Sequence, residues 1–173
     1  AKAQHALSGN LCRCTGYRPI VDAAVTMHHW PQSGLSEGEL LEKLEALAAD
    51  RLKSRGAEDS QDSYMAPRSL AELLRLRATH PQAQLVAGCT DVGLWITKGH
   101  KRYDTIIDVT RVSELKQIEH GANDLSIGAA ATLNDAFAAL GADRPQLVHF
   151  FERFAGLPVR QSGTLGGNVA NGS

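Results

Sequence analysis

Residues 84–91 read QLVAGCTD, a short apolar run that ends in a glycine-containing turn. This pattern predicts a buried strand that ends at Gly88 and a helix that begins near Asp91. Such a turn leaves several backbone N–H groups and the Thr90 hydroxyl facing whatever lies before the helix, and a phosphate group fits there. The Asp91 carboxylate would repel a phosphate, so it could instead cap the helix, bond a sugar hydroxyl or contact another loop. A plain strand-to-helix turn is the alternative, because the three glycines of the Gly-x-Gly-x-x-Gly fingerprint are missing.

A second glycine-bearing loop lies near the end of the chain, where residues 163–168 read GTLGGN. Its two adjacent glycines would let the backbone pass within contact distance of a ligand, and Asn168, Asn171 and Ser173 could supply donors and acceptors. A hairpin turn is the alternative. Eleven of the 16 glycines follow residue 84. Two phosphate-friendly loops joined by a β-rich segment fit a dinucleotide held at both ends.

The cysteines are few and unevenly spaced. Cys12 and Cys14 lie one residue apart, so both thiolates could reach one metal ion or one iron–sulfur cluster, although two reduced surface thiols are the alternative. Cys89 follows Gly88 in an apolar approach and is expected to be a small packing residue. An odd number of cysteines without a paired framework favours a reducing compartment, and we expect the cytoplasm.

The remaining pattern predicts alternating helices and strands. Helices are expected after Pro19, after Ser36, after Ser69, from about Thr132 and from Pro145, because N-capping residues or proline precede apolar positions at helical spacing. Leucines 70, 73, 74 and 76 are expected to form one apolar face, and leucines 40 to 52 another. A strand is expected at 105–109, and a hairpin at 115–119 and 125–128 around the turn 121–124. Residues 54–66 contain almost nothing to bury and are expected to be mobile.

Composition excludes several classes of protein. The chain has 173 residues, of which 43% are hydrophobic and 21% charged, with 18 basic and 19 acidic residues. This balance provides no field for nucleic acid or an anionic membrane, and no apolar run approaches the roughly 20 residues that cross a bilayer. No context singles out a nucleophilic triad. The chain begins without Met and ends in turn residues, so we expect it to be a piece of a longer protein.

Three stretches together resemble one family, the molybdenum hydroxylases, and within it the iron–sulfur and flavin chain of bacterial xanthine dehydrogenases. SGNLCRCTGYRPI at 8–20 resembles the end of the helical iron–sulfur domain, LVAGCTD at 85–91 the first flavin loop, and GTLGGNVANGS at 163–173 the second. They occur in the family's order with a linker between. The resemblance implies an α+β fold: the C-terminal remnant of a helical 2Fe–2S domain at 1–30, a linker with one helix at 31–66, and the first part of a FAD-binding domain at 67–173.

The resemblance also implies the cofactor-binding residues. Cys12 and Cys14 would be two of the four ligands of a 2Fe–2S cluster. The FAD site would be formed by Leu85, Val86, Ala87, Gly88, Cys89, Thr90, Asp91, Val92, Phe154, Thr164, Gly167, Asn168, Asn171 and Ser173. Phe154 could alternatively belong to a core with Phe150 and Phe151.

The chain departs from the family pattern in three ways. The family's other cysteine pair would lie upstream of Ala1, so the cluster could not be completed within these residues. Cys89 replaces a glycine of the usual Gly-Gly-Thr-Asp loop, which restricts φ without excluding FAD. The family's Pro-x-x-Asp continuation, and the half that contacts NAD, would follow Ser173.

The function implied by the resemblance is electron transfer during purine oxidation. Electrons would pass from a molybdenum cofactor on a separate large subunit through 2Fe–2S clusters to FAD and then NAD, while xanthine or hypoxanthine is converted to urate. No catalytic acid or base is assigned, and these residues alone are expected to show no turnover. An aldehyde or N-heterocycle hydroxylase is one alternative. A non-catalytic fragment that docks a partner through the helix at 40–52 is another.

Overall fold

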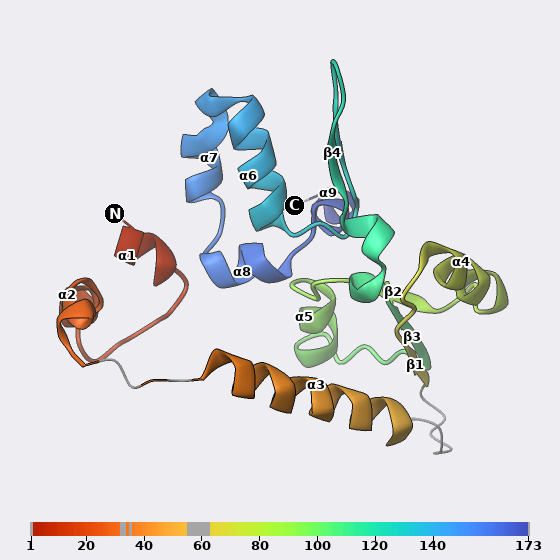
Figure 1. Cartoon of the computed structure of the whole chain (residues 1–173). Coiled ribbons are helices and arrows are strands. Elements are labelled where there is room, and N and C mark those ends of the chain that lie inside the picture. The colour runs from red at the N-terminus through yellow and green to blue at the C-terminus, as the bar shows by residue number, and fades with distance from the viewer. Residues whose placement is uncertain (1, 32–33, 35, 55–62, 173) are drawn as a thin grey trace. The chain divides into compact units, whose positions relative to one another are not determined.

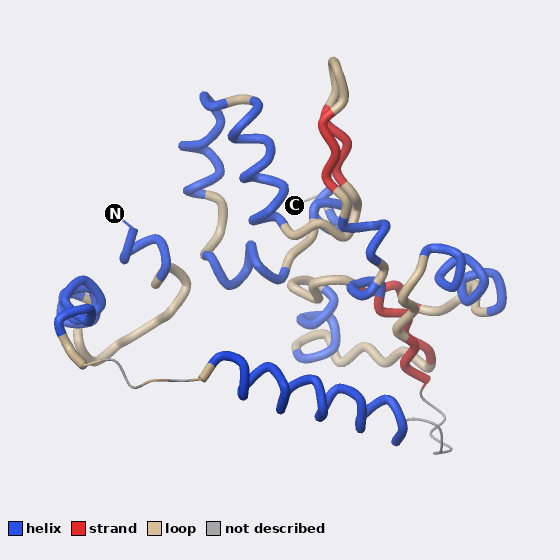
Figure 2. Tube along the Cα trace, viewed as in Figure 1, coloured by secondary structure: helices blue, strands red, loops and turns tan. Residues whose placement is uncertain are grey.

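The computed structural model describes residues 2–31, 34, 36–54 and 63–172, with side chains outside 48–63. The chain divides into two compact units: a larger unit of residues 1–11 and 62–173, and a smaller unit of residues 12–61. Helices and short strands both occur in the described residues, which confirms the α+β class (Figure 2).

A parallel sheet forms the base of the larger unit. It contains β1 (Ser63–Met65), β3 (Thr105–Asp108) and β2 (Gln84–Val86), in the order β1-β3-β2 (Figure 1). Both outer strands run parallel to β3, with Tyr64 and Gln84 opposite Ile106. Since β2 is parallel to β3, the loop that follows β2 leaves the carboxyl edge of the sheet, where ligands bind in open α/β sheets.

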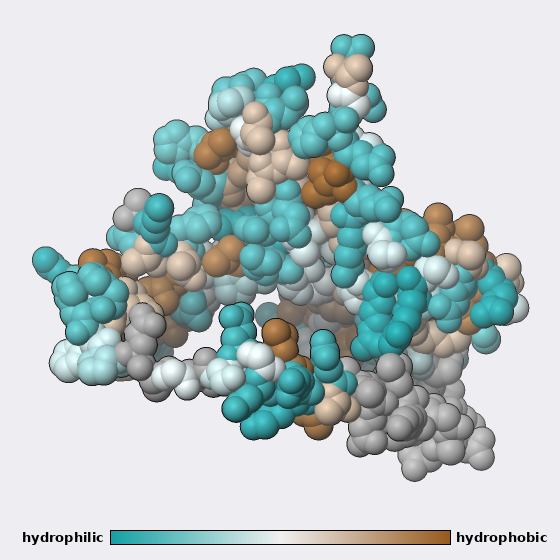
Figure 3. Space-filling view, in the orientation of Figure 1, coloured by the Kyte–Doolittle hydropathy of each residue, from teal (hydrophilic) through white to brown (hydrophobic). Residues whose placement is uncertain are grey.

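The core of this region lies between the sheet and helix α4 (Leu70–Thr79). Ile107 and Val112 are fully buried, and Leu73 of α4 is 8% exposed. Ser69 caps α4, because its hydroxyl accepts a hydrogen bond from Glu72 N at 3.3 Å. The expectation of one apolar face on α4 is wrong at Leu74, which is 61% exposed; hydrophobic residues gather on the outer side of α4, at the right of Figure 3.

A hairpin follows the sheet. After two 3₁₀ turns, η2 (Val109–Arg111) and η3 (Ser113–Lys116), the antiparallel strands β4 (Ile118–His120) and β5 (Leu125–Ile127) pair. The hairpin and its turn are confirmed, since Gly121 N donates to Asp124 O at 2.9 Å. The expected start at residue 115 is wrong, because residues 113–116 form a 3₁₀ turn whose carbonyl at Leu115 accepts from Ala130 N.

Helices make up the remainder of the larger unit. They are α5 (Val92–Thr97), α6 (Leu133–Asp143), η4 (Pro145–Leu147), α7 (Val148–Arg153), α8 (Leu157–Ser162), α9 (Leu165–Asn171) and, from the start of the chain, α1 (Lys2–Ala6). Thr132 caps α6 as expected, accepting from Asp135 N at 3.1 Å. The alternative of a hairpin turn at 163–168 is wrong, because Thr164 caps helix α9 there.

The smaller unit is helical in its described residues. It contains α2 (Arg18–Thr26), η1 (Met27–His29) and α3 (Glu37–Ser54). Ser36 caps α3 through a hydrogen bond from Glu39 N at 3.4 Å. Leu40, Leu44 and Leu47 of α3 are 45–63% exposed. No described helix combines the length and the apolar character that crossing a membrane requires.

Residues 54–66 were expected to be mobile, and this expectation is wrong at the end of the segment. Residues 63–65 form β1, paired in register with residues 105–107 of β3. Residues 55–62 lie outside the described residues. The segment gave no local signal for β1, since it is mostly polar. The strand forms because it pairs with β3, which is distant in sequence.

Candidate cofactor sites

The first candidate site is the loop that contains Cys12 and Cys14. Their Sγ atoms lie 3.3 Å apart, so both thiolates can reach one metal ion. The loop turns sharply because Gly16 and Tyr17 both adopt positive φ, of 67° and 71°. The Tyr17 hydroxyl accepts a hydrogen bond from Cys12 N at 3.2 Å, which fixes the two ends of the loop.

The loop also favours the thiolate form that binds metals. A hydrogen bond with the Thr15 hydroxyl at 3.2 Å, with smaller contributions from the Thr15 backbone and Cys14, lowers the pKa of Cys12 to about 7. Since thiolate, and not thiol, ligates iron, the loop fits half of a cluster site. Among the described residues no group of three or more His, Cys, Asp or Glu side chains could hold a metal ion.

The second candidate site begins at residues 85–92, after β2. Gly88 and Asp91 lie in the turn before α5, and Cys89 has a positive φ of 56°. In the described part of the chain, the amides of Thr90, Asp91 and Val92 donate to no acceptor. Asp91 occupies the N-cap position of α5, but its side chain makes no capping hydrogen bond. These free amides are the donors that a phosphate would need.

The structure brings the two predicted loops into direct contact. The Ser162 hydroxyl donates to Gly88 O at 2.7 Å, across 74 residues of sequence. A Cβ atom at Gly88 would lie 1.8 Å from Ser162 O, so the approach requires glycine. The Thr90 hydroxyl lies 3.6 Å from the position of a Cβ at Gly163. Loop 85–92 and loop 163–172 therefore form one continuous surface.

The second loop is held by the segment before α6. Leu165 N donates to Ala131 O and Gly166 N to Ala129 O, while Leu133 N donates to Gly163 O. Gly166 packs against Ala129, where a Cβ would lie 2.7 Å from the alanine Cβ. Of the adjacent glycines, Gly166 therefore serves packing, and Gly167 is the exposed member.

The predicted residues of the second loop differ in accessibility. Thr164 is 5% exposed, and its hydroxyl accepts from Gly167 N at 3.3 Å. Asn168 is half-buried and Asn171 is exposed, both on α9. Ser173 lies outside the described residues.

Phe154 belongs to an aromatic cluster in the larger unit. Its ring packs edge-on against Phe137 at 5.4 Å between centroids, and Phe137 stacks on Phe151 at 4.4 Å. Phe150 is 62% exposed, so it is not a core residue in this structure. Phe154 ends α7 as its C-cap and is half-buried.

Two further residues of the larger unit escaped the sequence reasoning. Ser162 links the loops, and Arg160 is a buried cation, 3% exposed, whose guanidinium donates to two backbone carbonyls. Ser162 carried no signal, because its partner depends on the three-dimensional fold. Arg160 carried a weak one, as a charged residue directly after the apolar and small stretch AGLPV at 155–159.

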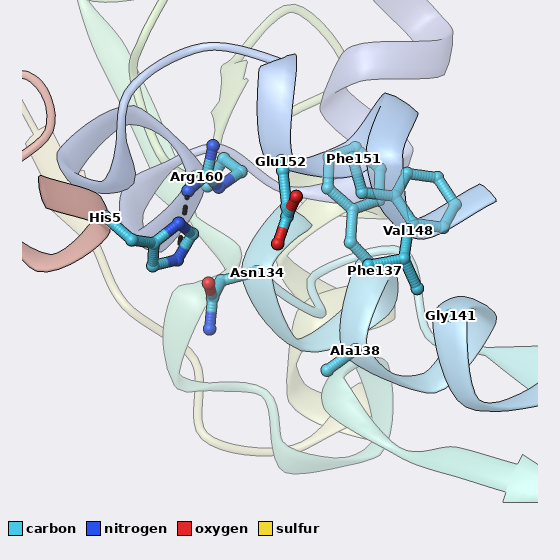
Figure 4. Close-up of a pocket in the computed structure, with 9 residues that line it drawn as sticks. All are labelled: His5, Asn134, Phe137, Ala138, Gly141, Val148, Phe151, Glu152 and Arg160. Carbon is cyan, nitrogen blue, oxygen red and sulfur yellow. Dashed lines mark hydrogen bonds between the residues drawn. The ribbon is translucent and has the colours of Figure 1, made fainter. Parts of the chain in front are cut away.

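A cavity of about 210 Å³ lies apart from the two loops, among α1, α6, α7 and α8 (Figure 4). Phe137 and Phe151 form its apolar wall, and His5 and Arg160 lie at its polar side.

Comparison with known proteins covers both candidate sites. Residues 58–173 match the family described as the FAD binding domain in molybdopterin dehydrogenase, and residues 1–25 match the [2Fe-2S] binding domain. The chain is 30% identical to xanthine dehydrogenase of Drosophila subobscura and 29% identical to indole-3-acetaldehyde oxidase of Arabidopsis thaliana. Each alignment covers 97% of this chain but only 16% and 15% of the respective relative.

Two solved structures have the same fold over about two thirds of the chain. Quinoline 2-oxidoreductase from Pseudomonas putida 86 is 30% identical with a TM-score of 0.58, over 66% of this chain and 41% of that one. Carbon monoxide dehydrogenase from Hydrogenophaga pseudoflava is 28% identical with a TM-score of 0.59, over 68% and 42%.

Proposed function

Because this chain belongs to the molybdopterin dehydrogenase FAD-binding family, with a 2Fe–2S-binding segment before the FAD-binding domain, we propose that it transfers electrons within a molybdenum hydroxylase. The cluster and FAD, when bound, supply the redox chemistry, and the protein holds and orients them. The observation that carries the proposal is the contact between the two loops, because one surface then presents both free amides and exposed glycine.

The FAD would be held by the residues of the two loops. The free amides of Thr90, Asp91 and Val92 would donate to the pyrophosphate, with residues 85–89 forming the turn beneath it. Gly167, Asn168, Asn171, Ser173 and Phe154 would contact the rest of the cofactor. Thr164 would contribute by capping α9, since its hydroxyl is already bonded within the protein.

Cys12 and Cys14 would supply two of the four thiolate ligands of the cluster. The close Sγ pair and the lowered pKa of Cys12 support this role. We place the iron–sulfur segment at residues 1–30, the linker at 31–66 and the FAD-binding domain at 67–173.

For the complete protein, we propose a bacterial xanthine dehydrogenase acting in the cytoplasm. A separate large subunit would carry the molybdenum cofactor, and NAD would be the final acceptor during oxidation of xanthine or hypoxanthine to urate. The resemblance of the cysteine and flavin loops to this branch, and the relative from Drosophila subobscura, support the proposal. An aldehyde or N-heterocycle hydroxylase is supported by relatives that act, by name, on indole-3-acetaldehyde and quinoline.

Binding of FAD by the chain tests the cofactor proposal. The fluorescence of FAD should be quenched on titration with the 173-residue chain. Gly167→Leu should abolish this quenching, because Gly167 is exposed and close to the proposed cofactor. Gly38→Leu, in the smaller unit with open space around it, is the control for a leucine placed in a helix; it lacks the 2.9 Å approach that a Cβ at Gly167 would make to Thr164 Oγ1. Equal quenching in the two variants would favour a docking fragment over a flavin domain.

A test of the proposed substrate requires the complete protein with its large subunit. Reduction of NAD with xanthine, and not with aldehydes or quinoline, is the expected result. A preference for aldehydes or N-heterocycles in the same assay would replace the purine assignment.

A further inference from the structure

Arg160 is buried at a corner that joins three segments. Its Nη1 donates to Phe154 O and to Ala155 O, both at 2.8 Å. Ala155 has a positive φ of 50°, which is a strained conformation for a residue with a Cβ. The guanidinium therefore holds a strained corner, and that corner follows directly from Phe154.

The same guanidinium faces α1 at the start of the chain. Arg160 Nη2 lies 3.5 Å from His5 Nε2 (Figure 4). Arginine has donors and no acceptor, so Arg160 Nη2 can only be the donor in this contact. The buried guanidinium therefore contacts both the Phe154 corner and α1.

Three further contacts join the segment after α1 to the start of α8. The Ser8 hydroxyl accepts from Leu157 N at 3.0 Å, and Leu157 is the first residue of α8, whose amide has no partner within the helix. Gly9 has a φ of 87°, and a Cβ there would lie 2.8 Å from Pro158 Cδ. A Cβ at Gly156 would lie 3.0 Å from Gly9 Cα, so the two backbones touch.

We propose that these contacts, which we call the α1–α8 clasp (Ser8, Gly9, Gly156 and Arg160), couple seating of the iron–sulfur segment to the shape of the FAD site. One side of the clasp lies three residues before Cys12. The other side holds the Phe154 corner and α8, which leads through Ser162 into both flavin loops. The inference rests on the proposed function in naming FAD as the ligand that responds.

The coupling has a thermodynamic consequence. If docking of residues 2–9 stabilises the corner that FAD requires, then FAD must stabilise the docking by the same factor. Loosening the clasp at Ser8 should therefore weaken FAD binding, although Ser8 lies outside the residues proposed to contact it. Conversely, FAD should slow hydrogen exchange at residues 2–9.

The test is hydrogen–deuterium exchange and FAD titration on the full 173-residue chain. Ser8→Ala removes the cap of Leu157 N and should speed exchange at residues 2–9 and 154–157 by roughly fivefold, the factor of a typical lost N-cap. FAD affinity should fall several-fold, and Ser8→Thr should restore both. Gly156→Ala is a second variant; its φ of −84° suits alanine, so only the approach to Gly9 is altered.

Ser36→Ala is the control, because it removes a comparable cap from α3 in the smaller unit. Faster exchange at residues 2–9 without a change at 154–157 or in FAD affinity would overturn the coupling. A parent chain that binds no FAD would refute the proposed function instead, and exchange at 154–157 in Ser8→Ala would still decide whether the clasp acts on the corner.

Discussion

At the scale of single residues, Gly88 makes the closest approach in the candidate flavin site. Gly88→Ala should lower the free energy of unfolding by about 1–3 kcal/mol, because its Cβ would overlap the Ser162 carbonyl, which is rigid backbone. Gly93→Ala is the matched control: Gly93 lies in α5 with open space around it, so alanine should be neutral or stabilise by up to about 1 kcal/mol. Urea unfolding monitored by circular dichroism measures both, and equal stabilities would contradict the packed contact between the loops.

Cys89 is the second residue whose environment can be tested, because its surroundings change the pKa of its thiol. Burial, and after it the charge of Asp108, raises the pKa of this thiol. Since only the thiolate is alkylated, reaction with iodoacetamide should be slow at neutral pH and accelerate as pH rises toward the raised pKa. Asp108→Asn should shift this profile to lower pH, because it removes the nearby negative charge.

The exposed Asp104 provides the control for that profile. Asp104→Asn should leave the Cys89 rate unchanged, as measured by mass spectrometry of the peptide that contains Cys89. An unchanged profile in Asp108→Asn would mean that burial alone raises the pKa.

At the scale of secondary-structure elements, α9 depends on its cap. Two glycines and two asparagines make Leu165–Asn171 a poor helix by intrinsic propensity, so the Thr164 cap matters more than usual. Without FAD, Thr164→Ala should cost about 1 kcal/mol of stability, and Thr164→Ser should cost much less because the hydroxyl remains. Urea unfolding of the three proteins is the measurement, and a loss in Thr164→Ser equal to that in Thr164→Ala would show that the methyl group dominates.

Sequence reasoning located the elements whose signals are local. Ser69 and Thr132 were identifiable as caps, and the β-branched run at 105–108 as a strand, because each depends on neighbours within a few residues. The strand β1 depends on pairing with β3 about 40 residues later, and its three residues, SYM, are too short a run in a polar segment to predict a strand. The α9 helix was unexpected for the opposite reason, since its glycines suggested a turn.

In the candidate site, too, local motifs were predictable from the sequence and contacts between distant segments were not. The loop residues were recognisable as a set from their motifs, and the structure brings residues 85–92 and 163–172 together. The contacts of Ser162 and Arg160 could not be predicted, because their partners lie on other elements. Which loop atoms contact FAD stays a prediction.

At the scale of the whole molecule, the two compact units should respond differently to FAD. Each contains one tryptophan, Trp30 in the smaller unit and Trp95 in the larger. In Trp30→Phe, the remaining Trp95 should report that FAD at about 100 times its dissociation constant stabilises the larger unit by about 2.7 kcal/mol. In Trp95→Phe, the transition reported by Trp30 should move less, and equal shifts would indicate that the units unfold together.

The contact between Ser8 and Leu157 also bears on how the chain is made. It joins residues that are 149 positions apart, so the start of the chain waits for α8 to leave the ribosome. At ordinary rates of synthesis this interval is about 7 to 30 s. During that time Cys12 and Cys14 have already been synthesised, while residues 2–9 have no α8 against which to pack. Packing of residues 2–9 against α8 is therefore a late step in the folding of this chain.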